Sequence, residues 1–183
     1  MNELETKRLK LRRFRLSDIG DFYEYSSSPI VGPNAGWDYH RSKGEALSVL
    51  KSHLNNDEIW AIEYKDKQKV VGSIALQKDR KRENLSVRMM GYVLNPDYWG
   101  QGLATEASLA LLYYAFTYIG LSMVSVYHYP DNTRSKRVIE KCGFAYEGLL
   151  RQSTMTFNGK ILDEMCYSIT ADEFIKSRGI KRI

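Results

Sequence analysis

The sequence predicts an α/β (α+β) fold with a mixed, largely antiparallel sheet of about seven strands flanked by helices. Three observations predict it. Strand-like runs alternate with amphipathic helical runs, two pairs of strand-like runs are joined by short polar turns that suit hairpins, and helical runs lie between the other strands. A doubly wound sheet would alternate more regularly, so parallel pairing is expected only where a helix connects strands.

The expected elements follow one another without a linker or an internal repeat, so we expect one domain over residues 1–183. Apolar runs typical of strands occur at 8–14, 58–65, 69–77, 85–94, 122–129, 145–157 and 162–169. Helical spacing and capping residues predict helices after Ser17–Asp18, over 42–54, from the glycines near 100 to about 119, from Asn132 or Thr133 to Gly143, and near 171–178. Residues 28–41 hold two prolines and two glycines and are expected to form a loop.

Composition argues against several classes of protein. No apolar run approaches the roughly 20 residues of a membrane span, and the charged N-terminal segment lacks an apolar signal core, so a cytoplasmic protein without a membrane partner is expected. The two cysteines, Cys142 and Cys166, and the three histidines lack disulfide or metal-ligand spacing, so no metal is expected.

The net charge of +5 favours an anionic ligand. No helix-turn-helix, zinc-finger or RNA-binding signature accompanies the basic clusters, so nucleic acid is not the expected partner, although binding through those clusters remains an alternative.

The segment "NPDYWGQGLATEA" (95–107) indicates an anion site. Apolar and small residues spaced by three and one predict a buried helix that begins directly after Gly100 and Gly102. The first turn of such a helix has free backbone N–H groups, and glycines let an anion reach them. Thr105 stands where a Rossmann fingerprint needs glycine or alanine, and no Gly-Lys-Ser/Thr follows as in a P-loop, so neither nucleotide motif fits.

A second helix start follows the next expected strand, in "YHYPDNTRSKRVIEKCGF". Asn132 or Thr133 is a natural N-cap and Gly143 a natural C-terminal residue, while four basic residues load the helix with positive charge: Arg134, Lys136, Arg137 and Lys141. These features are compatible with simple capping and a solvated face. They also allow two helix starts to line one cleft.

The segments "YVLNPDYWGQGLATEA" and "NTRSKRVIEKCGFAYEG" resemble the two signature segments of the GNAT superfamily of N-acetyltransferases. Trp-Gly-x-Gly, Asn-x-x-Ser and Gly-Phe-x-x-Glu-Gly resemble its RimJ/RimL branch, and "LETKRLKLRRFRLSD" resembles that branch's first strand and helix entry. The resemblance spans nearly the whole chain. It implies a splayed central strand pair, here 85–94 and 122–129, with acetyl-CoA as co-substrate in the V-shaped gap.

The resemblance also implies site residues. Backbone groups of Tyr92, Val93 and Leu94 would meet the pantetheine arm and the thioester, and Asn132 would orient the cofactor. The pyrophosphate would be held by the turn made of Gly100, Gln101, Gly102, Leu103, Ala104 and Thr105. Trp99 stands at the first position of the family motif Q/R-x-x-G-x-G/A, as is common in this branch. Because the phosphate is bound mostly by backbone groups, binding should survive the replacement of Gln or Arg by Trp99.

The proton donor and the base differ from much of the family. A tyrosine donor seven residues after the Asn is replaced by Ile139, so the resemblance points to Ser135, three after the Asn, as general acid for the leaving thiolate. Where relatives carry a glutamate base, this chain has Thr154 or Tyr127. A water relay through Tyr127, His128 or an acidic residue stays open.

The expected activity is direct transfer of an acetyl group from acetyl-CoA to a primary amine, without a cysteine-linked intermediate. The acceptor stays open among a protein N-terminus, an amino acid, a polyamine and an amine-bearing antibiotic. For a polyamine, the acidic doublets Asp57–Glu58 and Asp163–Glu164 are candidates. The alternative is a non-catalytic acyl-CoA-binding sensor. A monomer or a homodimer is compatible with the sequence.

Overall fold

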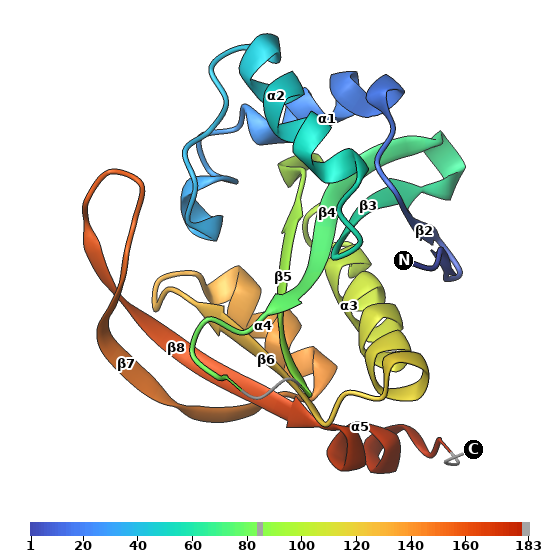
Figure 1. Cartoon of the computed structure of the whole chain (residues 1–183), viewed down its shortest axis with the longest axis vertical. Helices are drawn as coiled ribbons and strands as arrows, with labels where there is room; N and C mark the ends of the chain where they lie inside the picture. Colours follow the sequence, from blue (N-terminus) through green and yellow to red (C-terminus); the bar gives the residue numbers. More distant parts are fainter. Residues whose placement is uncertain (84–85, 181–183) are drawn as a thin grey trace.

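The structure is a computed structural model that describes residues 1–83 and 86–180. Within them, eight strands form one sheet in the order β1-β2-β3-β4-β5-β6-β8-β7 (Figure 1). Their bounds are β1 (Leu4–Glu5), β2 (Leu9–Arg12), β3 (Ile59–Tyr64), β4 (Lys69–Lys78), β5 (Val87–Leu94), β6 (Met123–His128), β7 (Ala145–Met155) and β8 (Ile161–Thr170). Every neighbouring pair is antiparallel except β5 and β6, which are parallel.

The largely antiparallel sheet is confirmed, with parallel pairing only where a helix connects the strands. The structure has one strand more than the seven expected. This strand is β1, which has two residues and in which Leu4 pairs with Leu11 and Glu5 with Lys10. Two residues are too few to show a periodicity of two, so sequence patterning could not find this strand. Leu85, where the strand 85–94 was expected to begin, lies outside the described residues.

Five α-helices occur in the described part of the chain: α1 (Ile19–Ser26), α2 (Lys43–Leu54), α3 (Leu103–Tyr114), α4 (Thr133–Cys142) and α5 (Ala171–Arg178). A π-helical turn, Ala115–Ile119, extends α3 to the predicted end near 119. Short 3-10 turns occur at Leu16–Asp18, Pro33–Ala35, Lys65–Lys67 and Pro96–Tyr98. None of the described helices is long and apolar enough to cross a membrane.

Two hydrophobic cores lie on opposite faces of the sheet. Leu9 and Leu11, two residues apart on β2, are fully buried in the core under α3, α4 and α5. The other core lies under α1 and α2 and includes Phe22 and Leu50. Helices therefore pack on both faces of the sheet.

The strands separate between β5 and β6. Their pairing is limited to Val87 with Met123, Arg88 with Val124, and Met89 with Ser125. Beyond that point β5 stays paired with β4 as far as Leu94, and β6 stays paired with β8 as far as His128. Each strand therefore follows its outer partner, and the two diverge into a V-shaped gap.

Candidate active site

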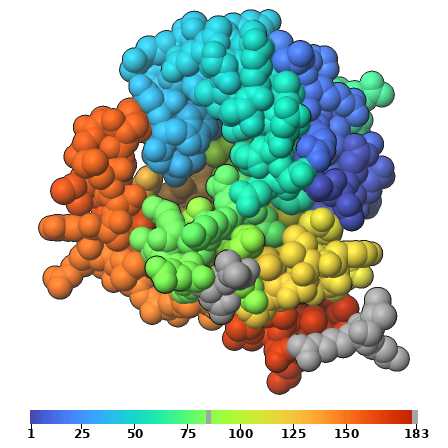
Figure 2. Space-filling view, in the orientation of Figure 1, coloured from blue at the N-terminus to red at the C-terminus, as the bar shows by residue number. Residues whose placement is uncertain are grey.

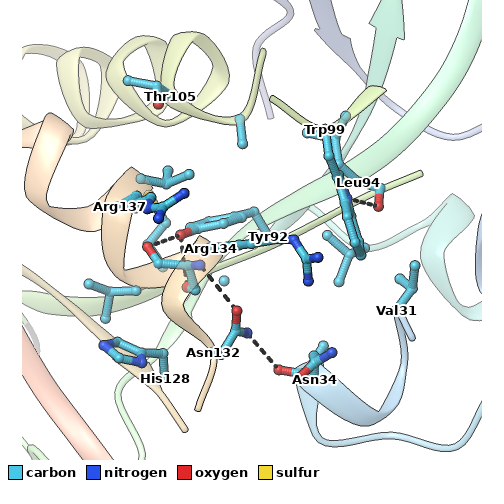
Figure 3. A pocket seen from close by; sticks show the side chains of 18 of the residues that line it. Val31, Asn34, Tyr92, Leu94, Trp99, Thr105, His128, Asn132, Arg134 and Arg137 are labelled. Carbon is cyan, nitrogen blue, oxygen red and sulfur yellow. Dashed lines mark hydrogen bonds between the residues drawn. The ribbon is translucent and has the colours of Figure 1, made fainter. Parts of the chain in front are cut away.

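A cavity of about 510 Å³ occupies the gap between the diverging strands (Figure 3). Its walls come from β5, β6, the turn that precedes α3, one face of α4, and the loop over 28–41. The lining includes Thr105 of α3 and Lys141 of α4, and Val31 and Asn34 from the loop under α1 and α2. The cavity therefore draws its walls from both faces of the sheet.

The backbone of β5 turns polar groups toward this gap. The Asn95 N–H donates to the Val71 carbonyl over 2.7 Å, and the antiparallel register then runs unbroken along β4. Because hydrogen-bonded and free edges alternate along such a pair, the N–H and C=O of Met90, Tyr92 and Leu94 face the gap. Val93 lines the cavity through its side chain, since its backbone groups face β4.

The turn before α3 has the conformation of an open anion-binding site. Gly100 and Gly102 have φ values of 74° and 77°, which residues with a side chain rarely adopt. Gly102 is the N-cap, and no side chain of the described residues caps the helix. The N–H groups of Leu103, Ala104 and Thr105 therefore start the helix without intrahelical acceptors, beside the cavity.

Arg8 holds this turn from the far side. Its guanidinium donates to the Gln101 carbonyl over 2.9 Å and to the Glu106 carboxylate over 2.7 Å. Gln101 itself does not line the cavity. Burial raises the pKa of Glu106, but hydrogen bonds from Thr6 and Arg8 hold it below its usual value. Glu106 therefore stays ionised, and the positive charge of Arg8 offsets its negative charge, so Glu106 does not repel an anion at the helix start.

Ser135, the predicted acid, has an unforeseen partner in the Tyr92 side chain. Tyr92 Oη lies 2.9 Å from Ser135 Oγ and donates to the Ser135 carbonyl over 3.2 Å. Burial raises the pKa of Tyr92 well above its usual range, so its hydroxyl stays protonated. Asn132 caps α4, since its Oδ1 accepts the Ser135 N–H over 3.1 Å, and its Nδ2 donates to the Asn34 carbonyl (Figure 3).

The end of the cavity near β6 carries a dense ionic network. The buried Asp79 carboxylate accepts hydrogen bonds from Ser125, Tyr127 and Arg82. Burial raises the pKa of Asp79, but these donors and the Lys81 N–H hold it below its usual value. Burial raises the pKa of Tyr127 to about 12, so this residue is a poor base.

Thr154, at one position where relatives have a glutamate, accepts a hydrogen bond from Arg80 over 3.3 Å. The nearby carboxylate of Glu164 forms ion pairs with Arg80 and Lys81. Burial raises the pKa of Glu164, but its hydrogen bonds to Lys81 and Arg80 hold it below its usual value. The carboxylates of Asp79 and Glu164 are therefore held by hydrogen bonds and ion pairs, and neither is suited to act as a base.

His128 also borders the cavity, from the end of β6. Its Nδ1 lies 2.8 Å from the Tyr129 carbonyl, which can only accept, so Nδ1 carries the proton. Nε2 is buried and has no partner within the described residues. Burial lowers the pKa of His128, so the imidazole is neutral near pH 7 with its lone pair on Nε2.

The predicted site residues thus gather at one place, except Gln101. The cavity lining contains Tyr92, Val93, Leu94, Gly100, Gly102, Leu103, Ala104, Thr105, Asn132 and Ser135. Sequence reasoning missed the roles of Arg8 and of the Tyr92 hydroxyl, because both depend on contacts more than 40 residues apart in the chain.

Comparison with known proteins identifies the class as acetyltransferases. Residues 8–145 match the family model described as "Acetyltransferase (GNAT) domain". The uncharacterized N-acetyltransferase YoaA of Bacillus subtilis (strain 168) is 31% identical over 175 residues, which cover 91% of this chain and 95% of that protein. The chain therefore belongs to the GNAT family, as the two sequence segments predicted, and it is an N-acetyltransferase.

Solved structures agree with this fold. A GNAT-family acetyltransferase from Bacillus anthracis superposes with a TM-score of 0.85 at 25% identity, covering 94% of this chain and 100% of that one. A putative ribosomal-protein-serine acetyltransferase from Vibrio cholerae gives 0.78 at 20% identity, covering 92% and 97%. The microcin C7 self-immunity acetyltransferase MccE, solved with acetyl-CoA and AMP, gives 0.76 at 20% identity, covering 90% and 93%.

Proposed function

We propose that the protein transfers the acetyl group of acetyl-CoA to a primary amine inside the cavity between β5 and β6. The observation that carries the proposal is that one cavity joins an open helix start to the part of β5 whose backbone does not pair with β6. The residues fit CoA, because free N–H groups and cationic side chains lie at one part of the wall, and carbonyl and N–H groups of β5 lie at another. GNAT enzymes use acetyl-CoA, which supports the choice of donor.

Bound acetyl-CoA would supply an activated thioester. Backbone N–H groups of β5 that face the gap can stabilise negative charge on a carbonyl oxygen. The Ser135 hydroxyl can donate a proton or a hydrogen bond to a departing thiolate, whose conjugate acid has a pKa of about 8.5. Tyr92 keeps Ser135 oriented for this role through the 2.9 Å contact between their hydroxyls.

The acceptor amine must be neutral to attack. His128 supports this step, because it borders the cavity and its buried Nε2 has no hydrogen-bond partner in the described residues. The lone pair on Nε2 can therefore accept a proton from the amine. Both cysteines are buried outside the cavity lining, and burial raises the pKa of Cys142 to about 12. These features support direct attack on the thioester rather than a cysteine-linked intermediate.

The charges around the cavity favour an acceptor with a single amine, such as an α-amino group, over a polyamine. A polyamine needs free carboxylates, but Glu164 is paired with two cations and Asp57 with the N-terminal amine and Arg13. Neither acidic doublet lines the cavity. Figure 2 shows the surface hollowed between the segment around 28–41 and the β7–β8 hairpin, and we propose that the acceptor amine enters there.

The proposal is tested by incubating the protein with acetyl-CoA and matched acceptors, and by following thiol release together with acceptor mass. The panel compares peptides with free N-termini, the same peptides with blocked N-termini, single amino acids, and spermidine. We expect turnover that requires a free α-amine and exceeds that with spermidine. Tight CoA binding without turnover on any amine would contradict the enzymatic proposal and favour the sensor, and preferred turnover of spermidine would contradict the acceptor class.

A further inference from the structure

Helix α4 presents a row of cations to the cavity. Arg134, Arg137 and Lys141 are spaced by three and four residues, lie on one helix face, and all line the cavity. Among residues 1–83 and 86–180, no carboxylate forms an ion pair with any of the three, whereas Lys136 on another face pairs with Glu140. Unpaired cations that converge on a cavity favour an anionic ligand there.

Arg134 is held in place by an aromatic ring. Its guanidinium lies 4.6 Å from the ring centroid of Trp99, within the range of a cation–π contact. The Trp99 indole N–H donates to the Leu94 carbonyl over 2.8 Å, which fixes the ring against β5. The contact therefore joins α4 to the turn before α3 across the cavity (Figure 3).

Arg137 completes the arrangement. Figure 3 shows its side chain on the side of the cavity where Thr105 starts α3, while Arg134 lies toward Trp99. The two arginines thus line the same cavity as the free N–H groups of the helix start, with Arg137 on the side of Thr105. Guanidinium groups bind phosphate oxygens through directed, charge-assisted hydrogen bonds.

Resting on the proposed use of acetyl-CoA, we propose that Arg134 and Arg137 bind the diphosphate of CoA and that Trp99 positions Arg134 for this contact. Trp99 thereby gives phosphate binding a side-chain contribution, because it positions an arginine that comes from α4. Phosphate binding is then shared between the α3 backbone and two α4 side chains.

The test measures binding by calorimetry of three probes: CoA, dephospho-CoA, which keeps the diphosphate, and pantetheine, which has no phosphate. We expect Arg134→Ala and Arg137→Ala each to weaken CoA and dephospho-CoA by about 10- to 100-fold and to leave pantetheine unchanged. Lys136→Ala is the matched control on the same helix and should bind all three probes as the unaltered protein does.

Trp99 is tested with two replacements. Trp99→Phe keeps a ring for the guanidinium and should retain most of the affinity, whereas Trp99→Leu should weaken CoA about as much as Arg134→Ala. Combining Trp99→Leu with Arg134→Ala should add little further loss, because both changes remove the same contact. Thermal unfolding of each variant checks that the fold is retained.

Several outcomes would overturn this inference. Losses below twofold for Arg134→Ala and Arg137→Ala, or equal losses for pantetheine, would show that these residues do not bind phosphate. Losses for CoA without losses for dephospho-CoA would place the contact at the 3′-phosphate instead of the diphosphate. If the unaltered protein bound pantetheine and CoA equally or neither of them, the proposed use of CoA would fail as well, and this result is distinct from a failure of the variants alone.

Discussion

Ser135 and its hydrogen-bonded partner are the residues on which the proposed proton transfer depends. We expect Ser135→Ala to lower kcat about 100-fold, at the low end for loss of a general acid, because a thiolate is already a fair leaving group. KM should change little, since Ser135 contacts the reacting sulfur only as charge develops. The measurement is thiol release under steady-state conditions, with Ser177→Ala on α5 as a control serine. Unchanged turnover in Ser135→Ala would rule out this role.

The Tyr92 hydroxyl is expected to act through Ser135. Tyr92→Phe removes the 2.9 Å contact and should lower kcat about 10-fold, near the free energy of one hydrogen bond. In the Ser135→Ala background the same change should have no further effect, because its partner is gone. Equal losses in both backgrounds would show that Tyr92 acts independently of Ser135.

His128 should matter most for amines that are strongly protonated at neutral pH. We expect His128→Gln to lower kcat more for an acceptor amine with a pKa near 10 than for an α-amine with a pKa near 8, which is partly neutral without help. The measurement is the ratio of the two rates at pH 7.5 in both proteins. A uniform loss for both amines would indicate a structural effect through the stacked ring of Tyr167.

At the scale of elements, two glycines with the same backbone conformation allow the effect of strain to be distinguished from the effect on ligand binding. Gly102 and Gly120 have nearly the same φ, 77° and 76°, but only Gly102 lines the cavity. An added Cβ at Gly120 meets no atom within 4 Å, and at Gly102 it meets only an Arg8 nitrogen at 3.7 Å. We expect Gly102→Ala and Gly120→Ala each to cost about 1 kcal/mol of stability.

Only Gly102→Ala should also weaken CoA, because its strain reshapes the helix start that faces the ligand. Chemical denaturation of both variants measures the stability loss, and calorimetry measures their affinity for CoA. Equal CoA affinity in the two variants would remove the turn from the proposed phosphate site.

Elements with a clear period were predictable from the sequence, and contacts between distant elements were not. The α3 stripe predicted the helix and its open start, and Asn132 and Gly143 predicted the ends of α4. The splay between β5 and β6 followed from family resemblance, because no local pattern shows where two strands stop pairing. The contact of Arg8 with Glu106 joins residues 98 positions apart, and that of Arg134 with Trp99 joins residues 35 positions apart. Sequence spacing carries no signal of such contacts.

At the scale of the whole molecule, two buried carboxylates connect the strands around the splay. Asp79 joins the end of β4 to β6 through Ser125 and Tyr127. Glu164 joins β8 to the segment after β4 through Arg80 and Lys81. Each residue is 2% exposed, so both carboxylates connect strands in the interior beside the splay, where β5 and β6 no longer pair with each other.

These links predict how stability depends on pH. The pKa values of Asp79 and Glu164 are lowered on folding from ordinary values of 3.8 and 4.5, so the unfolded chain takes up these protons first as pH falls. Their contribution is therefore fully present above pH 4.5 and is lost as pH falls from there through the lower pKa values of the folded state.

Glu164→Gln should consequently reduce the free energy of unfolding by about 2 kcal/mol at pH 7, because it leaves two cations without their charge partner. The difference from the unaltered protein should shrink as pH falls below 4.5, because the stability carried by the ionised Glu164 is lost as the carboxylate becomes protonated. Urea denaturation at pH 7, 5, 4 and 3 measures this convergence, with Glu58→Gln as the exposed control. A difference that stays constant with pH would mean that Glu164 stabilises the splayed sheet by its packing and not by its charge.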